Sequence, residues 1–352
     1  MFGKNIDNLI ADIAIDEKNN ITLGQLKVKT QTNAQKIEVF LPFPIGFASD
    51  LSLRIQERLA LHGIKQEIVL CKKIISHKVK TGLNTLPEIK NTLAIASGKG
   101  GVGKSTVTAN LAVALSKAGA RVGILDADLY GPSQPTMFAL QNKKPDQENK
   151  MFIPLEANGI QIMSIGFMVD DNQALVWRGP LITQALQQMF FQTAWNKLDY
   201  LLIDLPPGTG DIQLTLSQKI PLTASLIVST PQDIALIDAK KAINMFEKVS
   251  VPVLGIVENM SIYICPCCGR REEIFGSGAG EYLSQQYQLP LLGKLPLSAN
   301  IRQAMDSGLP FDLFDDISLS SGYNDVAYRV SVEMAKLGKD YSNAFPKMVV
   351  AN

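Results

Sequence analysis

The chain has 352 residues, 46% of them hydrophobic, which is enough for two domains with a sizeable core. Its 34 lysines and arginines nearly balance its 33 aspartates and glutamates, and a net charge of +1 gives no general attraction to nucleic acid or to an anionic membrane. The start of the chain lacks the apolar core of a signal peptide, and no apolar run approaches the roughly 18 residues of a membrane helix, so we expect a cytoplasmic protein that binds neither nucleic acid nor membrane.

Residues 1–80 have the pattern of a small α+β domain, and residues 81–91, which include a glycine and a proline, that of a linker. The expected elements follow the order α-β-β-α-β: a helix at 5–15, strands at 25–30 and 36–41, a helical face at 51–59 and a strand at 66–75. Cys71 falls among the apolar residues of the last strand, which favours a small core residue over a metal ligand.

Residues 93–106, LAIASGKGGVGKST, contain the phosphate-binding motif G-x-x-x-x-G-K-S/T between an apolar strand and a helical pattern. Glycines in this context turn backbone N–H groups toward phosphates, and the helix dipole adds positive potential. We expect ATP here, with Lys104 at the β- and γ-phosphates, Ser105 as a Mg²⁺ ligand and Thr106 beside the α-phosphate. The predicted nucleotide contacts in the loop are Gly98, Lys99, Gly100, Gly101, Val102, Gly103, Lys104, Ser105 and Thr106.

Over residues 92–352 strands and helices alternate, which predicts a doubly wound, mostly parallel α/β sheet. The strand at 121–126 ends in Asp126-Ala-Asp128, and ligands bind beyond the carboxyl ends of such strands, so both aspartates should lie beside the phosphate loop. Asp126 is a candidate for the Mg²⁺ shell, and Asp128 for orienting or deprotonating the attacking water. The alternative is that one of them only caps the turn.

A further strand, at 199–204, ends in Asp204 and is followed by LPPGTGD. An aspartate at this place in a phosphate-loop protein is expected to bind Mg²⁺ through a water. The glycines that follow it allow the backbone to approach the γ-phosphate and to move when that phosphate leaves, which is the behaviour of a switch.

Three of the four cysteines lie at 265–268, a grouping that suits a metal or redox site in a reducing cytosol better than a disulfide framework. Cys265 and Cys268 form a C-x-x-C pair, and this spacing predicts that the side chain of Cys267 points away from a bound metal. Two thiolates leave a tetrahedral site half complete, and a second chain related by two-fold symmetry would supply two more, for a [4Fe–4S] cluster or a zinc ion. A metal-free redox dithiol is the remaining alternative.

The second lysine of SGKGGVGKST, Lys99, makes this loop resemble the deviant phosphate loop of the SIMIBI ATPases, which include the MinD and ParA partition proteins. The resemblance implies that Lys99 crosses a dimer interface to the partner's nucleotide, whereas its residue type alone suggests a solvated loop lysine. It also implies a hydrolytic role for Asp128, and an adenine-reading role for the amide of Asn259, which is otherwise a turn residue at a strand end. The predicted catalytic residues are therefore Lys99, Lys104 and Asp128.

Further motifs resemble, in order, those of the Mrp/ApbC/NBP35 family of iron–sulfur cluster carriers. They are WRGP at 177–180, LPPGTGD at 205–211, STPQD at 229–233, ENMS at 258–261, the C-x-x-C, and FGSG at 275–278. This resemblance, over about residues 90–310, implies a homodimeric ATPase that binds a [4Fe–4S] cluster between its subunits and has apo iron–sulfur proteins and cluster scaffold proteins as partners. Many members have histidine where this chain has Cys267, which leaves the role of that thiol open.

The order of elements in residues 1–80 likewise resembles the MIP18-like domain that precedes the ATPase part of many bacterial Mrp proteins. The alternative function is a MinD/ParA-like, ATP-gated positional or regulatory switch with a structural metal. Membrane association of the MinD type needs a basic amphipathic helix near the C-terminus, and residues 337–352, which contain Pro346, do not have that pattern.

Overall fold

The structure is a computed structural model, and it describes residues 5–16, 20–80, 82–129, 131–168, 179–265 and 267–340. Several features singled out in the sequence fall partly outside these ranges: the first half of the WRGP motif, at 177–178, residue 266 of the C-x-x-C motif, the first residue of the linker at 81–91, and most of the segment at 337–352. Among the described helices, none is both long and apolar enough to cross a bilayer.

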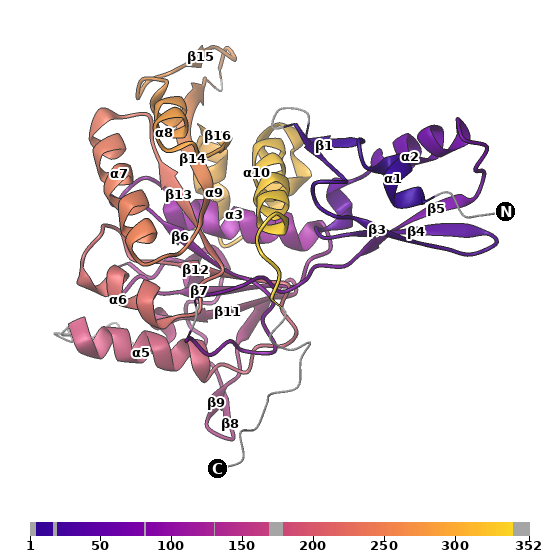
Figure 1. The fold of residues 1–352 in the computed structure, drawn as a ribbon. Helices are drawn as coiled ribbons and strands as arrows, with labels where there is room; N and C mark the ends of the chain where they lie inside the picture. The colour runs from indigo at the N-terminus through magenta and orange to yellow at the C-terminus, as the bar shows by residue number, and fades with distance from the viewer. Residues whose placement is uncertain are drawn as a thin grey trace.

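A nine-stranded, mostly parallel sheet forms the centre of the molecule, as predicted (Figure 1). Its strands follow the order β10-β11-β7-β12-β6-β13-β14-β15, with β16 also paired to β14. Only β10 and β15 run antiparallel to their neighbours. The strands are β6 (Thr92–Ala96), β7 (Val122–Asp126), β10 (Leu155–Ala157), β11 (Ile160–Ser164), β12 (Tyr200–Asp204), β13 (Ala224–Ser229), β14 (Val253–Ile264), β15 (Arg271–Glu272) and β16 (Leu291–Leu297).

Helices cover both faces of this sheet, with α3 and α10 on one face and α5 and α6 on the other (Figure 1). The helices are α3 (Lys104–Lys117), α4 (Gln134–Met137), α5 (Gly179–Phe191), α6 (Asp211–Lys219), α7 (Asp233–Lys248), α8 (Ala279–Tyr287), α9 (Ala299–Asp306) and α10 (Ile317–Ala335). The described part of the chain also contains three 3₁₀ turns and the hairpin of β8 and β9: η1 (Ile45–Phe47), η2 (Ile165–Phe167), η3 (Asp312–Asp315), β8 (Gln147–Glu148) and β9 (Met151–Phe152).

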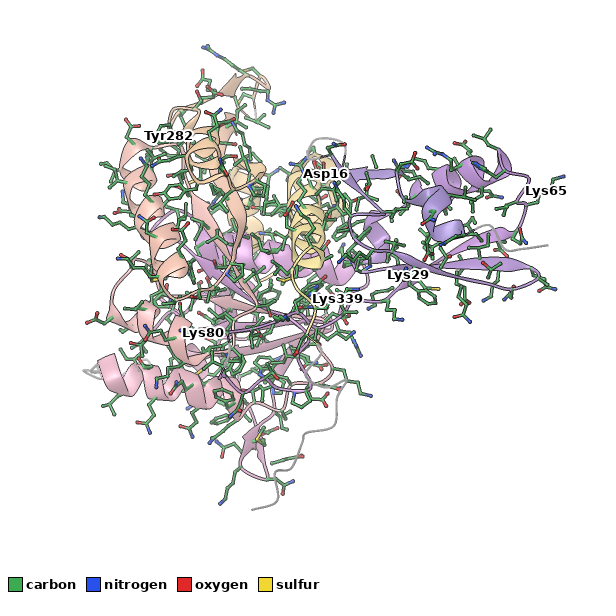
Figure 2. All side chains as sticks on the ribbon, in the orientation of Figure 1. Asp16, Lys29, Lys65, Lys80, Tyr282 and Lys339 are labelled. Carbon is green, nitrogen blue, oxygen red and sulfur yellow. The ribbon has the colours of Figure 1, made fainter. Side chains whose placement is uncertain are left out.

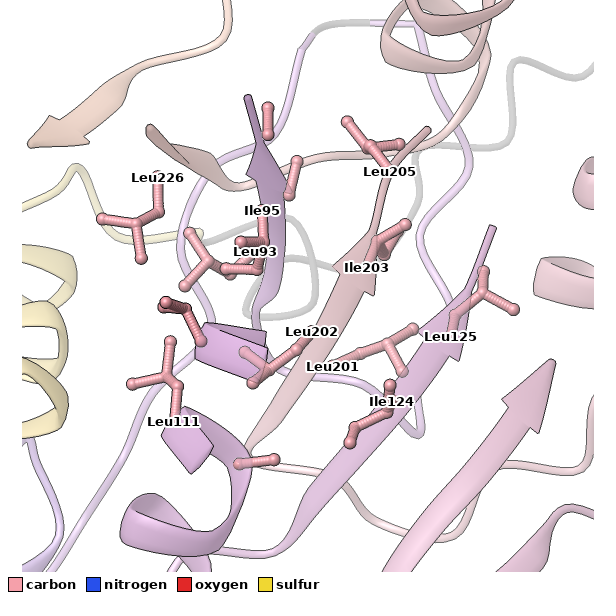
Figure 3. Packing of buried hydrophobic residues seen from close by; sticks show 14 of the residues in the cluster. Leu93, Ile95, Leu111, Ile124, Leu125, Leu201, Leu202, Ile203, Leu205 and Leu226 are labelled. Carbon is pink, nitrogen blue, oxygen red and sulfur yellow. The ribbon is translucent and has the colours of Figure 1, made fainter. Parts of the chain in front are cut away.

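The four central strands, β6, β7, β12 and β13, are buried along their whole length, because helices cover both faces of a parallel sheet. Figure 3 shows Leu93 and Ile95 of β6, Leu111 of α3, Ile124 of β7 and Leu202 of β12 packed together, all fully buried. Each such side chain contributes about 1.5–3 kcal/mol through removal of apolar surface from water. This packing holds the carboxyl ends of β6, β7 and β12 in fixed register.

The N-terminal part has its own three-stranded sheet, in the order β3-β4-β5, and its own apolar core. Its elements are α1 (Ile6–Ile10), β1 (Ala14–Asp16), β2 (Ile21–Thr22), β3 (Lys29–Thr32), β4 (Lys36–Leu41), α2 (Leu51–Ala60) and β5 (Glu67–Lys72). The predicted helix at 5–15 is wrong in its second half, because Ala14 pairs with Thr22 in a short hairpin. The strand predicted at 25–30 begins later, since Lys27 has a φ of 53°, outside the strand region.

Helix α10 contributes to both cores, although it follows all the strands in the chain. Val332 and Ala335 are buried in the N-terminal core, and Tyr328 packs its ring against Phe43 at a centroid distance of 5.6 Å. Figure 2 shows Asp16 beside this helix, where its carboxylate lies 3.6 Å from the guanidinium of Arg329. The domain limits at residues 80 and 92 stay predictions, but α10 ties the two parts together.

A buried carboxylate, Asp199, joins the N-terminal part to the start of β12. It accepts hydrogen bonds from Lys72 at 3.0 Å and from Lys90 at 2.8 Å. The backbone N–H of Arg121 donates to it at 3.0 Å, and the guanidinium of Arg121 at 3.3 Å. Burial alone would raise the pKa of Asp199, but the hydrogen bonds from Lys90, Arg121 and Lys72 outweigh it and lower that pKa to about 2.

Candidate nucleotide site and cysteine loop

The phosphate loop connects the end of β6 to the start of α3, as the motif predicts. Gly98 packs so closely on α7 that a Cβ there would lie 2.0 Å from the backbone oxygen of Asp238. Gly103 has a φ of 79° and lies against Asn259, so a side chain would be strained and would also collide with that amide. The loop borders a cavity of about 210 Å³, which is lined by Ser97, residues 99–106, Asp128 and Pro207.

Lys104 is buried at the first turn of α3 and points into a group of carboxylates. Its Nζ contacts Asp204 directly and lies 3.8 Å from Asp128 Oδ2. Thr108, one turn along the helix, donates to the same Asp204 oxygen at 3.3 Å. The structure therefore brings three predicted site residues together, with the lysine charge neutralised by carboxylates.

Asp126 lies fully buried at the carboxyl end of β7, beside Asp204 at the end of β12. Its Oδ2 accepts from Ser164 Oγ at 3.0 Å and from the backbone N–H of Gln134 at 3.2 Å, and its Oδ1 from the backbone N–H of Asp128 at 3.2 Å. Burial, and then repulsion from Asp204, raise the pKa of Asp126 to about 7. Two adjoining carboxylates of this kind are a donor set that suits a hard cation such as Mg²⁺.

Gln134, which the sequence interpretation missed, fills the space between these carboxylates and the phosphate loop. It is fully buried, and its Nε2 donates to Asp204 Oδ2 at 2.9 Å and to the backbone oxygen of Ser105 at 3.1 Å. The only sequence signal is its place shortly after Asp128, at a predicted strand end, and none of the motifs found in this sequence includes it.

Asn259 and Lys99, which are also predicted to contact a nucleotide, have different surroundings in the structure. Asn259 is buried on β14, and its Nδ2 donates to the backbone oxygen of Val102 at 2.9 Å. Lys99 is exposed, and its backbone oxygen accepts a hydrogen bond from Ser97 Oγ at 2.9 Å. Asn259 thus touches the loop backbone, while Lys99 points to solvent, so base reading by the first and contact across a dimer by the second stay predictions.

The cysteine loop begins where β14 ends. Cys265 follows Ile264, its backbone N–H donates to the oxygen of Arg270 at 2.9 Å, and its own backbone oxygen accepts from the N–H of Gly269 at 2.9 Å. These bonds close a tight loop, which continues into β15. Cys265 is partly buried, whereas Cys267 and Cys268 are exposed.

Hydrogen bonds within this loop act on the thiol of Cys265. Backbone N–H groups of Cys267 and Cys268, and then the Cys268 thiol, donate to the Cys265 sulfur and lower its pKa. The Cys267 thiol contributes least to lowering that pKa, and the prediction that its side chain points away from a bound metal stays a prediction. Among the described residues, no three potential metal ligands converge in one chain, so the loop by itself offers an incomplete coordination set.

Glu258 ties the cysteine loop back to the sheet and was also missed by the sequence interpretation. This carboxylate is buried on β14, next to Asn259, and accepts from the N–H of Gly280 at 2.7 Å. Lys294 of β16 lies 3.5 Å from its other oxygen. The start of α8, which follows the cysteine loop, is thereby fixed to the strand that precedes the loop.

The family model described as "ParA: NUBPL iron-transfer P-loop NTPase" matches residues 88–331. An "Iron-sulfur cluster carrier protein" of Pseudomonas fragi is 55% identical over 258 residues, which are 72% of this chain and 90% of that protein. A protein of the same description from Haemophilus influenzae is 45% identical over 329 residues, or 90% of this chain and 88% of its own.

Two solved structures are similar to this fold. A nucleotide-binding protein of Archaeoglobus fulgidus, in complex with ADP, has a TM-score of 0.58 and 41% identity, and the match covers 64% of this chain and 89% of that one. The cell division ATPase MinD of Pyrococcus furiosus has a TM-score of 0.53 at 22% identity, covering 69% of this chain and 98% of its own, a likeness of fold alone.

Proposed function

Since this chain belongs to the family of ParA/NUBPL iron-transfer P-loop NTPases, we propose that it is an ATP-hydrolysing iron–sulfur cluster carrier. It binds a [4Fe–4S] cluster between two copies of the chain and passes the cluster to apo-proteins. The cluster is cargo, and ATP is the substrate that controls its uptake and release.

The single observation that supports a coupling between ATP binding and cluster binding is the path of β14 from the phosphate loop to the cysteine loop. Asn259 on this strand contacts the middle of the phosphate loop through Val102, and the same strand ends one residue before Cys265. A displacement of the loop by nucleotide therefore has a short, rigid path to the cysteine. Packed secondary elements transmit such displacements as discrete shifts rather than absorbing them.

The residues of the phosphate loop suit a nucleotide with Mg²⁺. Lys104 is paired with carboxylates in the structure and is released from them when phosphates offer more negative charge. Ser105, Asp126 and Asp204 provide the oxygens to hold the metal and its waters. Bound Mg²⁺ neutralises the charge that develops on the β- and γ-phosphate oxygens during transfer.

Hydrolysis then depends on how the attacking water is oriented. Asp128 borders the cavity beside the loop and accepts a hydrogen bond from the water whose oxygen attacks the γ-phosphorus. The bond from that phosphorus to the bridging oxygen breaks, ADP keeps the electron pair, and the proton of the water goes to Asp128. Lys99, exposed at the rim, reaches the nucleotide of the second copy and stabilises the same charge.

Two copies complete the cluster site, because each contributes Cys265 and Cys268 and a cubane cluster takes four thiolates. Cys267 is a further thiol in the same loop, and it is either a spectator, a spare ligand or a participant in cluster transfer. Apo iron–sulfur proteins and cluster scaffold proteins in the cytoplasm are the proposed partners. A MinD-like switch with a structural zinc is the alternative function.

Anaerobic reconstitution of the full chain tests this function. We expect iron and sulfide at one [4Fe–4S] cluster per dimer, a broad absorption at roughly 400 nm, and transfer to an apo-acceptor that responds to ATP. A colourless protein that retains one zinc ion per dimer would support the switch instead. A stable cluster that is transferred at the same rate with and without ATP would contradict the proposed coupling, although it would still support cluster binding.

A further inference from the structure

Gln134 occupies a position that the phosphate-loop motif does not explain. Its side-chain amide bridges two elements of the site, since Nε2 donates both to Asp204 Oδ2 at 2.9 Å and to the Ser105 backbone oxygen at 3.1 Å. Its backbone N–H donates to Asp126 Oδ2 at 3.2 Å. One residue thus contacts the ends of β7 and β12 and the first turn of α3.

The other half of this amide has no partner. Gln134 is fully buried, and its Oε1 accepts no hydrogen bond from any described residue. A buried acceptor without a donor costs free energy, so such an atom in a ligand site indicates a donor that arrives with the ligand. The donors available at this place are the waters that a hard cation carries.

We propose that Gln134 is a positioning residue for the metal–nucleotide complex, an inference that rests on the proposed binding of ATP with Mg²⁺. Its Nε2 holds Asp204 in place when Lys104 leaves for the phosphates, and its Oε1 accepts a hydrogen bond from a water bound to the metal. Gln134 therefore links metal binding to nucleotide binding, rather than binding the nucleotide itself.

The arrangement around Asp204 supports this exchange of partners. Its Oδ1 is occupied by Lys104 and Thr108, whereas its Oδ2 is occupied by Gln134 alone among the described residues. When the lysine turns to the phosphates, Oδ1 would keep Thr108 and could accept a hydrogen bond from a metal-bound water in place of Lys104, while the bond to Gln134 keeps the carboxylate from rotating. A neutral amide suits this task, because an acidic side chain would repel Asp204 and the adjoining Asp126.

The test measures how strongly Mg²⁺ improves ADP binding to the full-length chain before cluster loading. The dissociation constant of a fluorescent ADP is determined in excess EDTA and in excess Mg²⁺, and the ratio of the two is the coupling. We expect Gln134→Leu, which keeps the size of the side chain, to lower this ratio at least about tenfold while the affinity in EDTA stays close to wild type. Binding of Mn²⁺ with ADP, followed by electron paramagnetic resonance, should weaken in parallel.

Gln161→Leu is the matched control. Gln161 is another buried glutamine, on β11, whose amide exchanges two hydrogen bonds with the backbone of Asn196 at 3.1 and 2.9 Å, away from the nucleotide site. This change should reduce thermal stability and leave the Mg²⁺ ratio as it is in wild type. If Gln134→Leu fails to fold, Gln134→Met provides the same measurement with a more adaptable side chain.

A wild-type ratio in the Gln134 variant, or an equal loss of affinity in EDTA and in Mg²⁺, would overturn the inference and leave Gln134 a structural residue. Failure of the proposed function looks different. In that case the wild-type chain itself would bind ADP without any help from Mg²⁺, or would not bind it at all.

Discussion

The side-chain amide of Asn259 donates a 2.9 Å hydrogen bond to the backbone oxygen of Val102, in the middle of the phosphate loop. Cys265 follows six residues later, directly after the end of β14. Glu258, on the same strand, accepts a hydrogen bond from the start of α8, which lies beyond the cysteine loop. The nucleotide site and the cysteines are therefore two ends of one extended segment. This arrangement makes the effect of nucleotide on the cysteine loop open to direct mutational tests.

We expect Asn259→Ala to separate cluster binding from its control by ATP. The variant should bind a full cluster, because all its thiolates are present, but ATP should change its rate of transfer less than in wild type. Nucleotide affinity should fall by about fivefold to tenfold, as for loss of one hydrogen bond of about 1–1.5 kcal/mol. The transfer rate to an apo-acceptor, with and without ATP, is the measurement. An undiminished response to ATP would mean that the signal travels by another route.

Lys104→Ala should weaken ATP binding at least about tenfold, since the β- and γ-phosphates lose their main side-chain partner. The titration of a fluorescent ATP analogue measures this effect. Lys117→Ala is the control, because Lys117 lies in the last turn of the same helix, is exposed, and pairs at 3.6 Å with Asp315. Affinity and turnover in Lys104→Ala equal to those of wild type would refute the phosphate-loop assignment.

Asp128→Asn should retain nucleotide binding and lower hydrolysis by about 10²-fold or more, because an amide cannot accept the proton of the attacking water. Phosphate release and ADP affinity, measured on the same preparation, separate the two effects. If binding is lost to the same degree as turnover, Asp128 is a structural partner of Lys104, from which it lies 3.8 Å away.

Cys265→Ala and Cys268→Ala should each remove the cluster from both subunits at once, because two thiolates remain where four are needed. Cys267→Ala should retain the cluster, with any effect confined to transfer rate or oxygen sensitivity. Iron and sulfide per dimer after anaerobic reconstitution provide the readout, and Cys71→Ala on β5 is the control. A full cluster in every single variant would contradict the model in which the cluster bridges two subunits. Loss of the cluster in Cys267→Ala alone would mean that Cys265 and Cys268 are not the pair that binds it.

Acid should destabilise the fold through Asp199. Its pKa is lowered from 3.8 to about 2 by Lys90, Arg121 and Lys72 against the effect of burial, so its contribution is complete above pH 3.8 and is lost as the pH falls through about 2. This difference corresponds to about 2 kcal/mol. Urea unfolding of wild type and Asp199→Asn at pH 6 and pH 3 measures the part that is lost by pH 3, about 1 kcal/mol, and wild type should lose that much more stability on acidification than the variant. Equal losses in the two proteins would show that Asp199 is not responsible.

The sequence predicted those parts of the site whose residues lie close together in the chain. The loop at 98–106 and the aspartates at the ends of β7 and β12 follow from contiguous patterns, since the carboxyl ends of parallel strands meet at one edge. Gln134, Glu258 and Asp199 act on residues distant in the chain, and their residue types fit many ordinary roles. The same limit explains the N-terminal error, because the pairing of Ala14 with Thr22 overrides a helical pattern that was locally plausible.

The position of α10 has a consequence for the order in which this protein matures on the ribosome. Val332 and Ala335 complete an apolar core whose other members lie between Ile10 and Leu59. The N-terminal part therefore cannot finish its packing until α10, which follows all the strands of the central sheet, has been translated. During that interval its exposed apolar surface is the natural target for a nascent-chain chaperone.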